Sequence, residues 1–343
     1  MSAMTLQLDV LRSVVDVDAE DWDGLVAAAG APAFYHHAFL SALEQLPLHA
    51  VEDRAYVVGR DPGDGTLRCG VPTYLVRGVD PMRVLADHVP ECADEPVLLS
   101  HVWHCYDGSP PVLGGDEHAW GEIVATVERL SREVGAARFC FANVEDDSEA
   151  ARGLTIAGIR CVEIDRRFVL DLAPVADYEA YLASISKGAR SNLRRYQRIA
   201  DDAGVELRTL APEEADLDAF VQLARGNAAK YGNAAYYDEQ RFPRFVRLLG
   251  ETARVIELRH EGRLIAGGIV LIDAAHVHWW SVGYADHAVE RLSPAYLVFA
   301  EIVRIALAHD VRWVECGRRN EAFKRRHGLT PRPLSAFVSP ALN

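Results

Sequence analysis

Four basic residues lie along one edge of a predicted helix in the second half of the sequence. Lys187, Arg190, Arg194 and Arg198 follow one another at spacings of three, four and four residues, so a helix places them on one side. Arginine presents a planar fork of donors that matches phosphate oxygens, which makes this edge a candidate phosphate-contacting surface. The alternative is the solvated face of an ordinary amphipathic helix. The opposite side is apolar, with Ile185, Ala189, Leu193, Tyr196 and Ala200.

A second set of chemically capable side chains lies on the predicted strand 276–284. Together with predicted strands at 254–259 and 263–272, it forms an antiparallel meander. Simple alternation places His278 and Tyr284 on one face, where either could pass a proton if the face borders a cleft. If the face belongs to the core, both are packing residues.

Two further features flank this meander. Gly267 and Gly268 lie inside the middle strand, where they allow either the close approach of a ligand or close packing. Ser293 and Pro294 begin a helix that continues to about His309, with Ser293 as the N-cap. A helix N-terminus attracts anions, although every helix has one.

The segment 315–328, ECGRRNEAFKRRHG, resembles the terminal motif of FemAB-like proteins, in which a strand ending in Gly-Arg is followed by a turn and Phe-Lys. The stretch 281–286 followed by 291–294 is similar to that family's loop into a long helix, and 187–198 is similar to its arginine-rich helix. PAFYHHAFLSALE at 32–44 resembles an N-terminal signature of peptidoglycan-biosynthesis-type relatives. These segments sample nearly the whole chain.

The resemblance implies an α/β protein with mixed sheets, built from two tandem GNAT-like domains packed together. Residues 1–160 would form the acceptor side, and residues 161–343 the donor-binding and catalytic side. The implied reaction is amide formation by acyl transfer onto an amine of a small molecule or cell-wall-type precursor. The implied donor is a co-substrate, namely aminoacyl-tRNA, acyl-CoA or an acyl carrier protein, and no cofactor is expected to bind tightly.

One departure from ordinary acetyl-CoA-dependent GNAT enzymes bears on the donor. Residues 290–295 read ERLSPA, which lacks the Arg/Gln-x-x-Gly-x-Gly/Ala pyrophosphate loop before the long helix. This weakens the case for plain acetyl-CoA. It also motivates an alternative hypothesis, a catalytically degenerate GNAT-fold binding or scaffold protein.

The resemblance maps the family lysine onto Lys324, where it would act electrostatically at the donor carbonyl or phosphate. Acyl transfer requires a neutral amine, a stabilised oxyanion and a route for one proton. Lys324 or a backbone amide near Gly317 would stabilise the oxyanion, and His278 or Tyr284 would carry the proton. No Gly-x-Ser-x-Gly elbow or Cys–His pairing is present, which favours direct transfer over a covalent intermediate.

The remaining site residues are assigned either to binding of the donor or to binding of the acceptor. A packing role is the alternative for His36 and His37 on the acceptor side. Tyr236, Tyr237 and Lys230 are candidate lid residues, with a solvated loop as the alternative. The expected donor-binding residues are Arg190, Arg194, Ser293, Gly317 and Arg318. The expected acceptor-binding residues are His36, His37, Tyr236 and Tyr237.

Composition and charge set broader limits. A length of 343 residues fits two domains, and half the residues are hydrophobic, which excludes a disordered chain. The net charge of −14 argues against DNA and anionic membranes as partners, although one basic groove would suffice for tRNA. Neither a run of apolar residues long enough for a membrane span nor a signal peptide is present, so we expect a cytoplasmic protein.

Six cysteines without a C-x-x-C pair predict reduced thiols rather than a disulfide framework. His101, His104 and Cys105 form the nearest approach to a ligand cluster, but they adjoin a turn-rich loop. We therefore expect no metal, and a metal hydrolase using these residues is the weakest of three hypotheses.

The first half reads as mixed α and β. Strong turn chemistry, DPGDG at 61–65, predicts a hairpin between strands 54–60 and 67–77. Gly158 marks a helix end before a new strand. The other predicted strands are 6–15, 138–144 and 161–172, and the predicted helices are 19–29, 36–46, 119–134 and 146–157.

Overall fold

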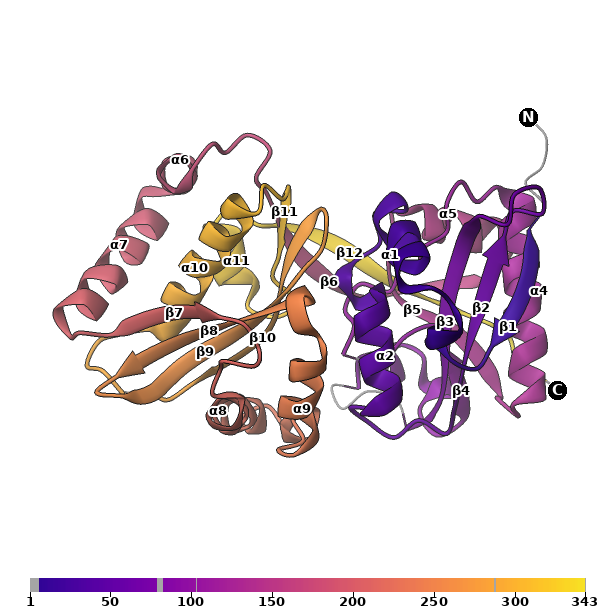
Figure 1. The fold of residues 1–343 in the computed structure, drawn as a ribbon, viewed down its shortest axis with the longest axis horizontal. Coiled ribbons are helices and arrows are strands. Elements are labelled where there is room, and N and C mark those ends of the chain that lie inside the picture. The colour runs from indigo at the N-terminus through magenta and orange to yellow at the C-terminus, as the bar shows by residue number, and fades with distance from the viewer. Residues whose placement is uncertain (1–5, 79–82, 103, 287, 343) are drawn as a thin grey trace. The chain divides into compact units, whose positions relative to one another are not determined.

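The computed structural model describes residues 6–78, 83–102, 104–286 and 288–342 (Figure 1). The chain divides into two compact units, of which unit 1 comprises Met1–Arg166 with Arg332–Asn343 and unit 2 comprises Arg167–Pro331. The predicted boundary after residue 160 falls within the same strand as this division. The structure adds that the last segment of the chain belongs to unit 1, which no local sequence pattern indicated.

Unit 1 contains a mixed sheet with the strand order β1-β2-β3-β4-β5-β12. Neighbouring strands are antiparallel except β4 and β5, which run parallel. The predicted hairpin around the DPGDG turn is confirmed as β2 and β3. The strands are β1 (Gln7–Leu11), β2 (Asp53–Arg60), β3 (Leu67–Arg77), β4 (Pro96–Leu99), β5 (Arg138–Glu145) and β12 (Thr330–Val338).

Alternating side chains on the unit 1 sheet pack into two separate cores. Val57 and Val71 belong to the cluster that contains Trp120 from α4. Tyr56 lies on the other face and belongs to the cluster that contains Trp22 from α1. This alternation is what period-2 burial of a strand predicts when both faces are covered. The helices are α1 (Ala19–Ala28), α2 (His37–Gln45), α3 (Val84–His88), α4 (Glu117–Glu133) and α5 (Glu149–Ile156).

The strands of unit 2 follow the order β6-β11-β10-β9-β8-β7. The meander β8–β9–β10 is antiparallel as predicted, whereas β11 runs parallel to β10 and antiparallel to β6. The strands are β6 (Arg160–Asp171), whose last residues enter unit 2, β7 (Glu206–Leu210), β8 (Ala253–His260), β9 (Arg263–Ile272), β10 (His276–Tyr284) and β11 (Trp313–Glu315).

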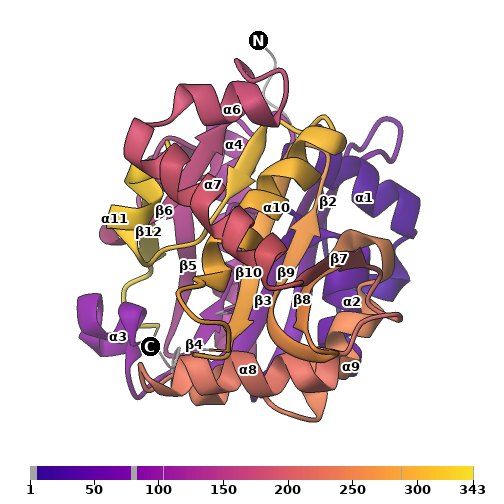
Figure 2. The same ribbon diagram turned by 90° about the vertical axis from the view of Figure 1, so that its left-hand side faces the viewer.

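Helices cover both faces of the unit 2 sheet. Helix α10 contacts α7 and the sheet on one face, while α8 packs on the other face of β9 and β10 (Figures 1 and 2). In the described part of the chain, no helix is both long and apolar enough to cross a lipid bilayer. The helices are α6 (Tyr178–Ser184), α7 (Lys187–Asp202), α8 (Leu217–Ala229), α9 (Arg241–Leu248), α10 (Pro294–Ala308) and α11 (Glu321–Arg326).

A β-bulge in β10 overturns the predicted alternation of that strand. Trp279 pairs with Val270 and Ser281 pairs with Ile269, so Trp280 is the extra residue. One extra residue reverses which face every later side chain occupies. His278 and Tyr284 therefore lie on opposite faces of the sheet, and the prediction that they share one face is wrong.

The strand glycines are explained by close packing of helices. A Cβ on Gly283 would lie 2.5 Å from the backbone nitrogen of Ala224 in α8. A Cβ on Gly267 would lie 2.9 Å from the Phe220 ring, and one on Gly268 would lie 2.7 Å from Val298 of α10. Of the two interpretations of Gly267 and Gly268, the structure favours packing over a bound ligand.

Replacing Gly283 by alanine should therefore destabilise unit 2, because the new methyl group meets helix backbone that cannot rotate away. We expect a loss of about 1–3 kcal/mol in unfolding free energy. Gly226→Ala, on the helix α8 that packs against Gly283, is the matched control, since its Cβ would meet nothing within 4 Å. That change should stabilise the helix by about 0.5–1 kcal/mol. Denaturant unfolding measures both, and a neutral Gly283→Ala would contradict the packing described here.

Candidate functional site

Buried charged groups form a connected chain in unit 2 where β10 meets β11. His278 lies directly opposite Glu315 in the parallel register. The Nε2 atom of His278 is 2.7 Å from Oδ2 of Asp273, and its Nδ1 atom is 3.8 Å from Oε2 of Glu315. All three residues are buried. One imidazole thus lies between two carboxylates in a place from which water is largely excluded.

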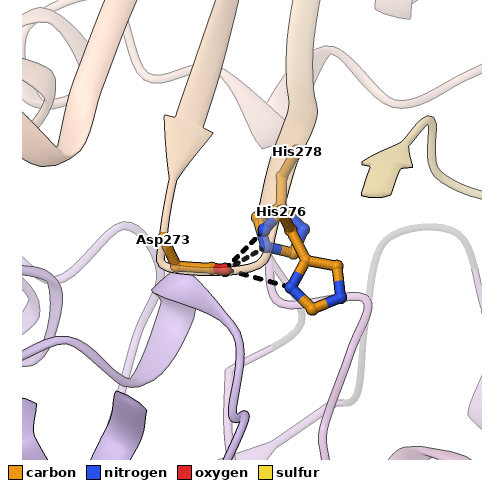
Figure 3. A group of neighbouring side chains, drawn as sticks. All are labelled: Asp273, His276 and His278. Carbon is orange, nitrogen blue, oxygen red and sulfur yellow. Dashed lines mark hydrogen bonds and ion pairs between the residues drawn. The ribbon is translucent and has the colours of Figure 1, made fainter. Parts of the chain in front are cut away.

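The turn between β9 and β10 fixes the first carboxylate. Asp273 Oδ1 accepts hydrogen bonds from the backbone N–H groups of Ala275 and His276, at 2.9 and 2.7 Å. The Nδ1 atom of His276 lies 3.0 Å from the same oxygen, so both imidazoles point at Asp273 (Figure 3). His276 and His278 are two residues apart before the bulge and project from the same face of β10.

The turn after β11 connects the second carboxylate to Lys324. Glu315 Oε1 accepts the backbone N–H of Gly317 at 2.8 Å. Gly317 has a φ of +67°, a left-handed conformation that glycine adopts without strain. Its carbonyl accepts the ammonium of Lys324 at 2.7 Å and the N–H of Phe168 at 3.1 Å. The Gly317 amide thus already donates to Glu315, and the oxyanion-stabilising role of either group stays a prediction.

Helix α11 turns Lys324 inward because its neighbour Phe323 is anchored on α10. The Phe323 ring centroid lies 5.1 Å from that of Tyr296 and 5.4 Å from that of Phe299. Lys324 is 5% exposed, and its ammonium stands 5.1 Å from the centroid of the Phe168 ring. The alternative that Lys324 is an exposed solubility lysine is therefore excluded.

Mutual stabilisation of opposite charges shifts the pKa values in this chain. Burial alone would raise the pKa of Asp273, but hydrogen bonds from His276 and His278 hold it well below the usual range. Burial would lower the pKa of His278, but Asp273 and Glu315 raise it to about 9. Burial also opposes ionisation of Glu315, yet His278, Arg167 and Lys324 lower its pKa. His278 is accordingly an imidazolium at neutral pH, which suits it to hold charge rather than to act as a base.

Strands β10 and β11 pair over a short stretch only. In the described residues their register covers His276–His278 opposite Trp313–Glu315, and β10 continues for a further six residues to Tyr284. Helix α10 then begins at Pro294 with Ser293 as its N-cap, as predicted, but the serine side chain makes no capping hydrogen bond. The Gly317 carbonyl that binds Lys324 thus lies just after β11, at the point where the pairing of β11 with β10 ends at His278.

Unit 2 has a parallel strand pair that ends early and a helix that follows it. The sequence of this unit also matches a known family. Residues 187–325 match the family model described as the acetyltransferase (GNAT) domain. Most of unit 2 therefore matches the GNAT domain family. No curated protein sequence matches the chain significantly.

Solved structures extend the likeness to almost the whole chain. FemX aligns with a TM-score of 0.66 at 10% identity, covering 97% of this chain and 98% of its own. A tandem GNAT protein from the clavulanic acid biosynthesis pathway gives 0.54 at 16%, with coverages of 97% and 98%. The C-terminal domain of a putative lysylphosphatidylglycerol synthetase from Agrobacterium fabrum gives 0.59 at 14%, with coverages of 96% and 93%. The predicted tandem GNAT fold is confirmed.

Two of the four basic residues on α7 make contacts within the GNAT domain. Arg190 donates to the carbonyl of Leu182 at 3.2 Å, and Arg194 donates to Glu179 at 2.7 Å. Lys187 and Arg198 are exposed, and within the described segments neither side chain makes a hydrogen bond or ion pair. Arg190 and Arg194 thus hold α6 against α7, and a role of the four basic residues in contacting phosphate stays a prediction.

The predicted acceptor-binding tyrosines lie beside β10. The Ser281 hydroxyl donates to the hydroxyl of Tyr237 at 2.9 Å, and the Tyr237 ring packs edge-on to Phe242. Tyr236 is half-buried next to it. Ser281 follows the bulge on the same face as His278, so Tyr237 is tied to the strand that carries the buried imidazole.

The other predicted acceptor residues belong to unit 1. His37 donates its backbone N–H to Asp23 at 2.7 Å, and its Nε2 atom lies 3.2 Å from the carbonyl of Val14. His36 is the N-cap of α2 and makes no capping hydrogen bond with its side chain. These contacts hold α2 in place. A role of either histidine in binding the acceptor stays a prediction.

Tyr284, Lys230 and Arg318 occupy the margins of this arrangement. Tyr284 is half-buried, and its backbone N–H donates to Asn227 at 2.6 Å. The Lys230 ammonium lies 5.7 Å from the centroid of the Tyr284 ring and pairs with Asp286. Arg318 is half-buried directly after Gly317. Tyr284 is separated from His278 by the sheet, so the two cannot share one proton route.

The cysteine-containing loop has no ligand geometry. His101 Nε2 lies 2.9 Å from the carbonyl of Phe34, and its Nδ1 atom accepts the N–H of Val102. His104 and Cys105 are buried nearby, but among the described residues they form no metal-ligand group with His101. All six cysteines are free thiols, as predicted, and five are buried. The metal-hydrolase hypothesis therefore has no support.

Sequence reasoning missed the two carboxylates that organise the site. Glu315 lies in the segment that carries the family resemblance, yet it received no role. Asp273 precedes a turn and the spacing His-x-His on a strand, which is a recognisable ligand pattern. Arg167, which lowers the pKa of Glu315, comes from β6 and has no local signal.

The raised pKa of His278 predicts a pH-dependent stability. The unfolded imidazole titrates near 6.5 and the folded one near 9, so its contribution is complete below 6.5 and is lost as the pH rises to 9. Over that window the unfolding free energy should fall by up to about 1.4 kcal/mol per pH unit. Denaturant unfolding in metal-free buffer measures it. His278→Asn should lack this slope, whereas His309→Asn at an exposed position should keep it. Identical profiles for wild type and His278→Asn would disprove the charge assignment.

Proposed function

We propose that the protein is an amide-forming N-acyltransferase that moves an aminoacyl or acyl group onto an amine. The donor class is an aminoacyl-tRNA or an acyl thioester of CoA or a carrier protein, and the acceptor is a small molecule or cell-wall-type precursor. The observation that carries the proposal is the buried ammonium of Lys324, held at 2.7 Å by the Gly317 carbonyl inside a GNAT domain.

The chemistry requires a positive group where the carbonyl oxygen becomes an oxyanion. An ammonium has three N–H donors, and the Gly317 carbonyl accepts one of them. A donor preorganised in a low-dielectric site stabilises developing negative charge far better than one in water. Because Phe323 and Gly317 hold Lys324 in place, the ammonium needs no rearrangement during attack.

Proton removal is assigned to a different part of the domain. The attacking amine must lose one proton, and His278 is a poor acceptor at neutral pH because, with a pKa raised to about 9 between two carboxylates, it already carries a proton. Tyr284 is half-buried at the end of β10, beyond the stretch that pairs with β11. We assign His278 to the positioning of Glu315 and leave Tyr284 as the candidate proton relay.

Substituting Lys324 tests the assignment. Lys324→Met should lower turnover at least tenfold, about 1.4 kcal/mol, because transition-state stabilisation is lost. Arg325→Met, one position along the same helix and exposed, is the matched control and should leave turnover unchanged. Product formation is followed by the mass increase of the amine. Full activity in a folded Lys324→Met protein would refute the role.

The donor class is distinguished by salt dependence. Aminoacyl-tRNA bound along α7 predicts affinity that falls steeply with salt, and removing Lys187 and Arg198 together should reduce the slope by about two. An acyl thioester predicts a shallow slope that this double variant leaves unchanged. Arg129→Ala on α4 of unit 1 is the control for a general loss of positive charge.

The scaffold alternative has a specific observation behind it, the sequence ERLSPA where a pyrophosphate loop would stand. The same assay separates it from an enzyme. Tight binding of a donor without any mass increase of an amine, across charged tRNA and acyl thioesters, would favour a binding protein.

A further inference from the structure

Three potential metal-ligand atoms converge in the turn between β9 and β10. Asp273, His276 and His278 each offer one ligand atom, and these atoms lie within 4.8 Å of one another (Figure 3). Among the described residues this is the only group of three or more histidine, cysteine or acidic side chains with that geometry. The ligand set of two imidazoles and one carboxylate suits Zn²⁺ and related divalent metals.

We propose that Asp273, His276 and His278 form a site for a divalent transition metal, with Zn²⁺ as the natural occupant. His276 would bind through Nδ1 and His278 through Nε2, the atoms that now face the carboxylate. Asp273 would bind through Oδ2. His276 is half-buried, so a fourth position can be taken by water reaching the site from its side.

The geometry needs only a small adjustment to admit the ion. Ligand atoms of a tetrahedral zinc site lie about 3.4 Å apart, given metal–ligand distances of about 2.0–2.2 Å. The present separations are 2.7 Å between Oδ2 of Asp273 and Nε2 of His278, and 3.0 Å between Oδ1 of Asp273 and Nδ1 of His276. No two ligand atoms of the group are more than 4.8 Å apart. The pair formed by Asp273 Oδ2 and His278 must open by less than about 1 Å, which side-chain torsions supply.

The surroundings of His278 favour that movement. Its other ring nitrogen faces Oε2 of Glu315 at 3.8 Å, a distance too long for a hydrogen bond. Within the described chain, this oxygen of Glu315 has no hydrogen-bond partner. A shift of the ring away from Asp273 would make room for the metal on one side and shorten the contact to Glu315 on the other. The result is a carboxylate–histidine–metal arrangement of the kind that orients metal ligands.

Asp273 is likewise supported for binding through one oxygen. Backbone N–H groups of Ala275 and His276 hold Oδ1, which leaves Oδ2 on the side of His278. Ligating carboxylates are characteristically hydrogen-bonded in this way. Two carboxylates, Asp273 and Glu315, also balance the charge of a divalent ion. Metal binding would replace the proton on Nε2 of His278 and release it to solvent.

Cobalt is the probe that tests the site in the full-length, untagged protein. After treatment with a chelator, addition of Co²⁺ should produce one equivalent of visible d–d absorption without the near-ultraviolet band of a cobalt–thiolate bond. His276→Ala and Asp273→Asn should each weaken binding at least tenfold. His309→Ala, an exposed histidine on the same unit, should leave it unchanged.

Two results would overturn the proposal. One is the absence of binding by the wild-type protein up to millimolar Co²⁺, and the other is undiminished binding by His276→Ala. His276→Gln, which preserves a hydrogen bond to Asp273, serves if the alanine variant fails to fold. A thermal midpoint that rises with Zn²⁺ in the wild type and not in His276→Gln provides a second readout that needs no assay of turnover.

Discussion

The constraint on which unit 2 depends is that a charge removed from water must be matched by an opposite charge or a hydrogen bond. Four charged residues of unit 2 are buried, namely Asp273, His278, Glu315 and Lys324. His278 lies between the carboxylates of Asp273 and Glu315. The backbone of Gly317 bonds to both Glu315 and Lys324. Removing one partner would leave another charge uncompensated. The fold therefore fixes these side chains more tightly than packing of apolar residues alone would do.

That constraint explains the local architecture around Lys324. The left-handed turn at Gly317 presents its N–H to Glu315 and its carbonyl to Lys324, so the two backbone groups of one residue satisfy both charges. The early end of β11 leaves β10 to continue with β9 alone, and the bulge at Trp280 changes which side chains face α8. The site is thus built from irregularities of the sheet rather than from its regular part.

Much of the fold was predictable from the sequence, because its signals are local. Alternating apolar residues, the DPGDG turn and the meander of β8, β9 and β10 were read correctly. The bulge was missed because no residue type at 279–281 demands it, and tertiary packing decides it. The return of the last strand to unit 1 depends on pairing with β5, a contact distant in sequence.

The candidate site was predicted less completely than the fold. Lys324 and Gly317 were assigned through family resemblance. Asp273 lies in the turn just before His276, where the local spacing could have indicated it, whereas Arg167 comes from β6 and reveals its role only when the sheet is assembled. His278 was assigned a proton-carrying role from its residue type. Its position between two carboxylates raises its pKa to about 9, which favours the imidazolium at neutral pH when no metal is bound.

The central claim is that the Lys324 ammonium polarises the carbonyl under attack. A crystal structure of the protein with a non-hydrolysable acyl-donor analogue tests this most directly. The account predicts the carbonyl oxygen, or the atom replacing it, at about 2.7–3.1 Å from Nζ of Lys324. An analogue whose carbonyl lies beyond hydrogen-bonding reach of that nitrogen, with the ammonium still bound only to protein groups, would contradict it.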